Sequence, residues 1–303
     1  MSLVVAVVGP TATGKSGLGL ALAEALGGEV VNADAFQLYR GMDVGTAKLR
    51  PEERRGIVHH QLDVLEVEED STVAAYQASA RADLRALEAR GTRAVVVGGS
   101  GLYVRALLDE LEFPGTDPEL RAALEERAER HGTRAVFEEL ERRDPVAAER
   151  IGPRNTRRIV RALEVIELTG QPYSASLPGE RYAVPAVQIG LEMPREELDE
   201  RIGLRVDHMW EQGLVAEVRS LAPRLGRTAA RAVGYAELLV HLRGECTEEE
   251  AREAVVANTR RLVRKQQSWF RRDPRITWLD AREPDLVDRA LSLVDEADRR
   301  LGR

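Results

Sequence analysis

The 303-residue sequence contains little cysteine and no long apolar segment, and each absence excludes a class of protein. The single cysteine, Cys246, cannot form an intrachain disulfide and leaves no thiolate cluster for zinc. With 43% hydrophobic and 31% charged residues, the chain is too polar throughout for a membrane protein. The segment MSLVVAVVGP has no basic region and breaks at Gly9 and Pro10, so it predicts a strand rather than a signal peptide. We therefore expect a cytoplasmic protein with no membrane partner.

Excess positive charge is also missing. A formal net charge of −7 argues against a generally basic surface for nucleic acid, although local clusters can still bind phosphates. Only three of the 44 cationic residues are lysines, namely Lys15, Lys48 and Lys265. Lysine is a compact, flexible point charge whereas arginine is a planar fork, so a lysine kept amid this bias is a candidate for a chemical role.

What the sequence does contain is an alternation of buried-type strands and helices. Short apolar strands are predicted at residues 3–8, 29–32, 93–97, 187–191 and 275–279. Helices are predicted at residues 15–26, 71–90, 194–221 and 247–271, the last begun by a Thr247–Glu250 capping box. This order predicts an α/β fold, a parallel sheet with helices on both faces.

Residues 115–184 differ in character from the rest of the chain. Charged helical segments dominate there, and no buried β-branched run is present. Because strand signals return afterwards, we expect an α/β catalytic core formed by residues 1–114 and 185–303, interrupted by an all-helical insertion over 115–184.

The strongest local motif is GPTATGKS, which matches G-x-x-x-x-G-K-[ST] and lies between a buried strand and a helix. Such a loop aims backbone N–H groups and a helix N-terminus at phosphate oxygens, while its lysine adds charge and its serine can ligate Mg²⁺. The alternative is a chance glycine-rich turn. The predicted phosphate-binding residues are Gly9, Pro10, Thr11, Ala12, Thr13, Gly14, Lys15 and Ser16, with Ser16 as the magnesium ligand.

A second feature of ordinary nucleotide hydrolases is missing. Their apolar strand with a terminal aspartate has no counterpart here, because strand 93–97 leads into Gly98, Gly99 and Ser100. The missing carboxylate argues against ATP hydrolysis, whereas it does not exclude a small-molecule kinase.

Asp34 follows the second strand, at the sheet edge where ligands bind in such folds. It is a candidate general base, and the alternative is a turn or helix-cap aspartate. Asp43, Thr46 and Lys48 follow closely and are either further polar ligands or part of a solvated turn.

Several motifs occur in an order that resembles a known family. They are GPTATGKS, NADAFQLYRGMDVGTAK, VVVGGSGLYVRALL, RIVRALEV, GLVAEV, RAVGYAE and TRRLVRKQQSWFRRD. Together they resemble the bacterial tRNA dimethylallyltransferases over essentially the whole chain. The resemblance implies a P-loop, kinase-like core with a helical insertion. It also implies transfer of a dimethylallyl group from dimethylallyl diphosphate to the exocyclic amine of the adenosine 3′-adjacent to the anticodon.

The resemblance also implies roles for individual residues. Asp34 would be the general base, while the phosphate loop, Arg205 and Mg²⁺ would hold the diphosphate leaving group. Ser100 stands where the family usually has threonine, and a serine hydroxyl can make the same hydrogen bond to substrate. Its alternative role is a simple turn after two glycines, and that of Arg205 is a solvated helix charge.

The partner implied by the resemblance is tRNA, bound through its anticodon stem-loop by a chain that we expect to be monomeric. The implied contacts are Asp34, Ala35, Phe36, Gln37, Ser100, Arg121, Arg157, Arg158, Ile159, Val160, Arg161, Arg231, Gly234, Tyr235, Arg264, Lys265, Gln266, Trp269 and Arg271. Cation clusters at 154–161 and 260–272 independently favour phosphate contacts, although solvated helix faces and core aromatics are the alternatives. The target base would have to flip out of its stack, and the helical insertion would close on the anticodon stem.

Three rival functions remain on the sequence alone. A P-loop kinase using ATP explains the first hundred residues but not the arginine-rich helices. An adenylate isopentenyltransferase would prenylate a free nucleotide, but the long carboxyl-terminal segments argue against it. A noncatalytic RNA-binding module is disfavoured by the intact Lys15, Ser16 and Asp34.

Overall fold

The computed structural model describes residues 2–176 and 181–302, which form two compact units. The first unit comprises residues 1–108 and 182–303, and the second comprises residues 109–181. The predicted insertion, 115–184, included residues 177–180, which lie outside the described residues.

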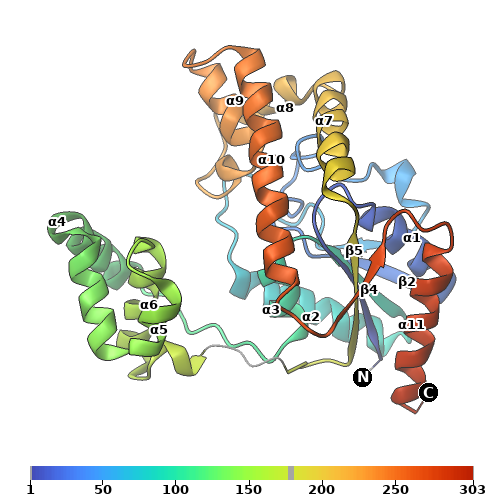
Figure 1. The fold of residues 1–303 in the computed structure, drawn as a ribbon, viewed down its shortest axis with the longest axis horizontal. Helices are drawn as coiled ribbons and strands as arrows, with labels where there is room; N and C mark the ends of the chain where they lie inside the picture. Colours follow the sequence, from blue (N-terminus) through green and yellow to red (C-terminus); the bar gives the residue numbers. More distant parts are fainter. Residues whose placement is uncertain (1, 177–180, 303) are drawn as a thin grey trace. The chain divides into compact units, whose positions relative to one another are not determined.

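A six-stranded parallel sheet forms the centre of the first unit, with strand order β3-β2-β4-β1-β5-β6 (Figure 1). Its strands are β1 (Val4–Val8), β2 (Gly28–Asn32), β3 (His59–His60), β4 (Arg93–Gly98), β5 (Ala186–Glu192) and β6 (Ile276–Asp280). The predicted α/β fold is confirmed, and each of the five predicted strands is present within two residues of its expected bounds. The short edge strand β3 was not predicted, because two residues are too few to show the alternating pattern of a strand.

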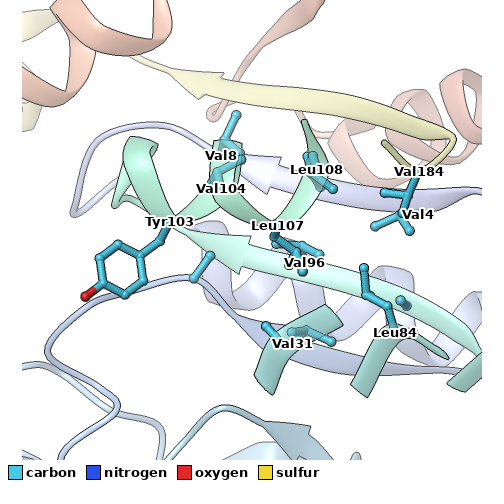
Figure 2. Close-up of a cluster of buried hydrophobic side chains, with 14 of the residues drawn as sticks. Val4, Val8, Val31, Leu84, Val96, Tyr103, Val104, Leu107, Leu108 and Val184 are labelled. Carbon is cyan, nitrogen blue, oxygen red and sulfur yellow. The ribbon is translucent and has the colours of Figure 1, made fainter. Parts of the chain in front are cut away.

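Alternation along β1 distributes its side chains to both faces of the sheet. Val4, Ala6 and Val8 belong to a core cluster with α2 (Val73–Ala89) and α3 (Gly101–Leu108), drawn in Figure 2. Val5 and Val7 belong to a second cluster with α1 (Lys15–Leu26) and α11 (Leu286–Arg300). Since successive side chains of a strand point to opposite faces, an unbroken apolar strand requires helices on both sides.

Further helices lie beyond the carboxyl ends of the strands (Figure 1). They are α7 (Arg195–Glu211), α8 (Leu214–Leu221), α9 (Tyr235–Leu242) and α10 (Glu248–Phe270), with two short 3₁₀ turns, η1 (Pro51–Arg54) and η3 (Ala229–Arg231), elsewhere in the unit. The Thr247–Glu250 capping box is confirmed, because the Thr247 hydroxyl accepts from the Glu250 N–H at 3.2 Å and the Glu250 carboxylate from the Thr247 N–H at 2.8 Å. The prediction of one helix over 194–221 was wrong: Gly213, at φ 91°, ends α7 and starts α8 in a conformation that favours glycine.

The second unit is a small helical bundle. It contains α4 (Pro118–Arg143), α5 (Pro145–Ile151), α6 (Thr156–Thr169) and the 3₁₀ turn η2 (Tyr173–Ser176). Its core includes Leu140, Ile159 and Leu163, each fully buried, and α4 packs mainly on α6. This bundle has an apolar core of its own.

None of the helices in the described residues is long and apolar enough to cross a membrane.

Candidate active site

The loop Gly9–Ser16 connects the carboxyl end of β1 to α1. Gly14 adopts a left-handed conformation at the helix N-cap, and the first turn of α1 has neither an acidic residue nor a side-chain cap. Within the loop, the buried Thr13 hydroxyl donates to the Pro10 carbonyl at 2.9 Å, and Lys15 Nζ donates to the same oxygen at 2.5 Å. An uncapped helix N-terminus with a lysine folded over its loop has the local geometry of an anion site.

The electrostatics of this loop involve two further charged groups. The pKa of Lys15 is lowered to about 7, chiefly by burial and also by the charge of Arg205 on α7, whereas the charge of Asp34 acts in the opposite direction. Burial likewise lowers the pKa of the Arg205 guanidinium, against the favourable charge of Asp34. In the described parts of the chain, Arg205 has no hydrogen bond or ion pair. The structure thus brings two desolvated cations, Lys15 and Arg205, within the electrostatic influence of one carboxylate, Asp34.

Asp34 is held by its neighbours at the end of β2. The side chain of buried Asn32 accepts from the Asp34 N–H and donates to the Asp34 carbonyl, both at 3.0 Å, and it also donates to the Gln61 carbonyl at 2.9 Å. One carboxylate oxygen of Asp34 accepts the Phe36 N–H at 3.0 Å. Asp34 therefore stabilises a turn, as the alternative interpretation of a turn aspartate proposed. Its charge also favours the charged forms of Lys15 and Arg205.

Ser100 lies directly beyond β4, next to the Asp34 turn. Its hydroxyl accepts from the Ala35 N–H at 3.1 Å, and its own N–H donates to the Ala33 carbonyl at 3.3 Å. Its carbonyl accepts the N–H groups of Tyr103 and Val104 in the first turn of α3. Ser100 therefore fixes the backbone on both sides of Asp34, and its hydroxyl lies at this edge of the sheet.

Glu217, which was not predicted, and Tyr235, which was predicted as a tRNA contact, hold the loop after Asp34. The Glu217 carboxylate of α8 accepts the N–H groups of Asp43, Val44 and Gly45 at 2.8 to 3.0 Å. The buried Tyr235 hydroxyl donates to the same carboxylate at 2.5 Å. Glu217 and Tyr235 lie in the motifs GLVAEV and RAVGYAE, and nothing in the spacing of these motifs indicates a contact with residue 43.

Lys48 does not reach the phosphate loop. It is buried, and its Nζ donates to the Tyr39 carbonyl at 2.7 Å, to Asp43 at 2.7 Å and to Asp63 at 2.6 Å. Thr46 likewise serves its own loop, where its hydroxyl donates to the Met42 carbonyl at 2.6 Å and its carbonyl accepts from Gln37 at 3.0 Å. Of the two alternatives for these groups, further ligands or a solvated turn, neither describes buried Lys48, whose hydrogen bonds organise the loop.

A small cavity opens beside the first turn of α1. Its lining comes from α1, β2, β3, β4 and the loops on either side of β3, and combines Ser16, Val30, Asn32, Gln37, Leu49, His59, Leu62 and Val97. Leu49, His59 and Leu62 were not predicted to lie here. The cavity places an apolar wall and the Ser16 hydroxyl at the same edge of the sheet.

The residues predicted to contact tRNA differ in how exposed they are to solvent. Arg157, Arg158, Arg231, Arg264, Lys265 and Arg271 are exposed, and Arg271 pairs with Glu192 at 3.0 Å. Asp34, Ala35, Phe36, Gln37, Ser100, Arg121, Arg161 and Trp269 are half-buried. Ile159, Val160, Gly234, Tyr235 and Gln266 are buried. The side chains of Ile159, Val160 and Tyr235 pack in apolar cores, and a role for these positions in binding tRNA stays a prediction.

Arg121 and Arg161 belong to a buried network in the second unit. The fully buried Glu164 carboxylate accepts from Arg121 at 2.7 Å, from Arg161 at 2.9 Å and from the Asp117 N–H at 3.0 Å. Arg161 also donates to the Pro114 and Gly115 carbonyls at 2.6 and 3.1 Å. Both arginines are therefore committed to holding the segment that enters α4.

Comparison with known proteins decides the family. A family model described as IPP transferase matches residues 37–273. The sequence is 60% identical to the tRNA dimethylallyltransferase of Thermobifida fusca, over 98% of this chain and 95% of that protein. It is 58% identical to the enzyme of the same name from Streptomyces coelicolor, over 96% of each. The chain belongs to the tRNA dimethylallyltransferase family. It is accordingly a prenyl-transferring enzyme.

Solved structures agree with this assignment. The tRNA isopentenylpyrophosphate transferase of Bacillus halodurans superimposes with a TM-score of 0.73 at 37% identity, with both chains covered completely. A eukaryotic dimethylallyltransferase described as acting on tRNA gives a TM-score of 0.85 at 24% identity, over 100% of this chain and 80% of that one. The second likeness supports the fold alone.

Proposed function

We propose that this prenyltransferase moves a dimethylallyl group from dimethylallyl diphosphate to the exocyclic amine of the adenosine 3′-adjacent to the tRNA anticodon. The observation that carries the proposal is the grouping of Lys15, Arg205 and Asp34 beside an uncapped helix N-terminus. Two desolvated cations favour a ligand with at least two negative charges, which a diphosphate supplies. The carboxylate provides the one basic group that the acceptor needs.

The donor would be held by its diphosphate. Backbone N–H groups of the loop and α1, together with Lys15 and Arg205, would bind the phosphate oxygens, and the charge that develops as the C–O bond breaks would be stabilised by the same groups. The electron pair of that bond leaves with the diphosphate. The uncompensated positive charge of Lys15 and Arg205 would thus stabilise the leaving group.

Magnesium fits the donors that the site offers. Among the described residues, no cluster of three or more His, Cys, Asp or Glu side chains can hold a metal, but the exposed Ser16 hydroxyl lies on the first turn of α1. Mg²⁺ often takes one or two protein ligands and completes its shell with phosphate oxygens and water. Ser16 would be its protein ligand, and the bound ion would help to neutralise the diphosphate.

The acceptor amine is a poor nucleophile because its lone pair is delocalised into the adenine ring. That lone pair forms the new N–C bond, and the nitrogen becomes acidic only as the bond forms. Asp34 would then accept the proton as general base. Ser100 would act by fixing the turn that presents this carboxylate, since its hydroxyl receives the neighbouring Ala35 N–H.

The acceptor tRNA would be recognised by exposed cations in each unit. Arg157 and Arg158 are exposed on α6, and Arg264 and Lys265 are exposed on α10. Such side chains bind the phosphate backbone, and their contribution is lost as the salt concentration rises. The stacked adenosine would be flipped out to reach Asp34.

The test is mass spectrometry of nucleosides from unmodified tRNA incubated with the protein, Mg²⁺ and dimethylallyl diphosphate. The expected product is a prenylated adenosine that maps beside the anticodon, and a transcript with guanosine at that position should remain unmodified. Parallel reactions contain AMP as acceptor, or ATP with hydroxyl acceptors. Prenylation of AMP alone would favour the nucleotide prenyltransferase, and ATP consumption with unmodified tRNA would favour a kinase.

A further inference from the structure

Gln266, in α10, is a buried amide whose two polar atoms join separate loops of the active site. Its carbonyl oxygen accepts the Thr11 N–H at 2.9 Å, across 255 residues of sequence. Its Nε2 donates to the Gly99 carbonyl at 3.0 Å, across 167 residues. The side chain is only 9% exposed. Gln266 thus connects the phosphate loop to the loop that carries Ser100.

The same face of α10 fits closely against the loop after β4. A Cβ at Gly99 would lie 2.5 Å from the Gln266 nitrogen, and a Cβ at Gly101 would lie 2.1 Å from the Trp269 ring. Real Cβ atoms do not make such contacts, so the glycines allow the helix to approach. Ser100, between them, therefore takes its position from α10 as well as from β4.

The exposed side of this helix turn is basic. Arg264 and Lys265 precede Gln266 directly and are exposed, whereas Gln266 itself is buried. Because each polar atom of Gln266 already has a partner inside the protein and the side chain is buried, little of it faces a ligand at the surface. Its two hydrogen bonds instead fix the distance between the loop expected to bind diphosphate and the loop beside the Asp34 turn.

We propose that Gln266 is a positioning residue of the donor site and not a tRNA contact. This inference rests on the proposed function, in which the loop Gly9–Ser16 binds the donor diphosphate. From α10, Gln266 fixes the position of that loop relative to the Ser100 loop. Its loss therefore weakens donor binding more than it weakens tRNA binding. An interaction with tRNA alone, as the family resemblance implied, would have the opposite effect.

The test compares Gln266→Met with Gln267→Met, a matched loss of an amide at the neighbouring half-buried position. Methionine keeps the length of glutamine but leaves the Thr11 N–H and the Gly99 carbonyl without their partner. We expect about a tenfold rise in the dissociation constant for inorganic diphosphate, measured by calorimetry without tRNA. The Michaelis constant for dimethylallyl diphosphate should rise similarly, and that for tRNA should change less than about twofold. Gln267→Met should resemble the wild type.

A second variant separates positioning from general destabilisation. Gln266→Glu keeps the shape and an acceptor for Thr11, and its protonated carboxyl can also donate to the Gly99 carbonyl. Its diphosphate affinity relative to wild type should therefore recover as the pH falls from 8 to about 5. A merely structural defect would show no such recovery.

Two outcomes overturn the assignment. One is equal diphosphate affinity in Gln266→Met and Gln267→Met, and the other is a rise in the Michaelis constant for tRNA with donor binding unchanged. Failure of the proposed function is visible separately. In that case wild-type protein would bind diphosphate but leave tRNA unmodified, and the diphosphate titrations would still decide whether Gln266 positions the loop.

Discussion

Each unit of the chain contains a group of two cationic side chains around one carboxylate, but the two groups are built differently. The helical group consists of Arg121, Arg161 and Glu164, and the core group consists of Lys15, Arg205 and Asp34. In the helical unit, Glu164 is fully buried and bonded directly to Arg121 and Arg161. In the core unit, the charges of Lys15, Arg205 and Asp34 influence one another. No hydrogen bond or ion pair joins these three side chains in the described residues. The first group is a completed structural network, whereas the second retains unsatisfied positive charge.

The pKa shifts express this difference. Burial alone would raise the pKa of Glu164, but the hydrogen bonds from Arg161, Arg121 and the Asp117 N–H lower it overall. At Lys15, burial and Arg205 lower the pKa, and the single carboxylate does not compensate. A buried charge whose partners are in place stabilises its fold, whereas an uncompensated one is typical of a site that awaits a ligand. Sequence alone cannot distinguish the two groups, because their compositions match.

Removing the carboxylate from the core group should give the largest effect on activity. In the variant Asp34→Asn, the amide oxygen of the new side chain can still accept the Phe36 N–H, so the turn is kept while the basic carboxylate is lost. We expect kcat to fall about a thousandfold, within the usual range for a general base. The measurement is single-turnover prenylation of tRNA, with diphosphate affinity as the control. Retention of more than about a tenth of the wild-type rate would contradict the assignment of Asp34 as base.

Removing the carboxylate from the helical group should instead reduce stability. Glu164→Gln leaves two arginines beside a neutral side chain in a buried position, and we expect a loss of about 3 kcal/mol in the free energy of unfolding of that unit. Diphosphate affinity should be unchanged, because the proposed donor site lies within the other unit. Denaturant unfolding measures the first quantity and calorimetry the second. Glu167→Gln, at an exposed ion pair with Arg143, should cost less than about 0.5 kcal/mol.

The sign of the pH dependence gives a further check on Glu164. Its pKa is lower in the folded chain than its ordinary value of 4.5, so its stabilising contribution is present above that value. The contribution is lost as the pH falls through the folded pKa. The stability difference between wild type and Glu164→Gln should therefore shrink in acid, and a difference independent of pH would show that charge is not its origin.

Most of the fold was predictable because its signals are local. The apolar run of β1, the glycine-rich turn, α1 and the Thr247–Glu250 capping box all lie within a few residues of their cause. The bonds that complete the site join distant residues, as between Thr11 and Gln266 or between Asp43 and Glu217. No periodicity marks such polar contacts, so they could not be predicted.

The burial of several predicted RNA contacts has a physical origin too. Ile159 and Val160 lie on the strongly amphipathic helix α6, whose apolar face could have identified them as core residues. Their assignment came from a motif taken as a block, and a motif contains residues that shape a site as well as residues that touch ligand. Tyr235 illustrates the same point, since its hydroxyl is bonded to Glu217 inside the protein.

The protonation of Lys15 on diphosphate binding tests whether the positive charge of the core group is uncompensated. Its pKa is about 7 in the unliganded site, and a bound diphosphate would favour the charged form and raise that pKa. Diphosphate binding at pH 8 should therefore take up a proton, and affinity should fall by up to about tenfold per pH unit between the unliganded and liganded pKa values. Calorimetry in two buffers of different ionisation enthalpy measures the uptake. The ligand's own titration persists in Lys15→Met, so the difference between wild type and variant isolates the lysine. Equal proton uptake in both proteins would mean that Lys15 is already charged before binding, and that the core group is as well compensated as the helical one.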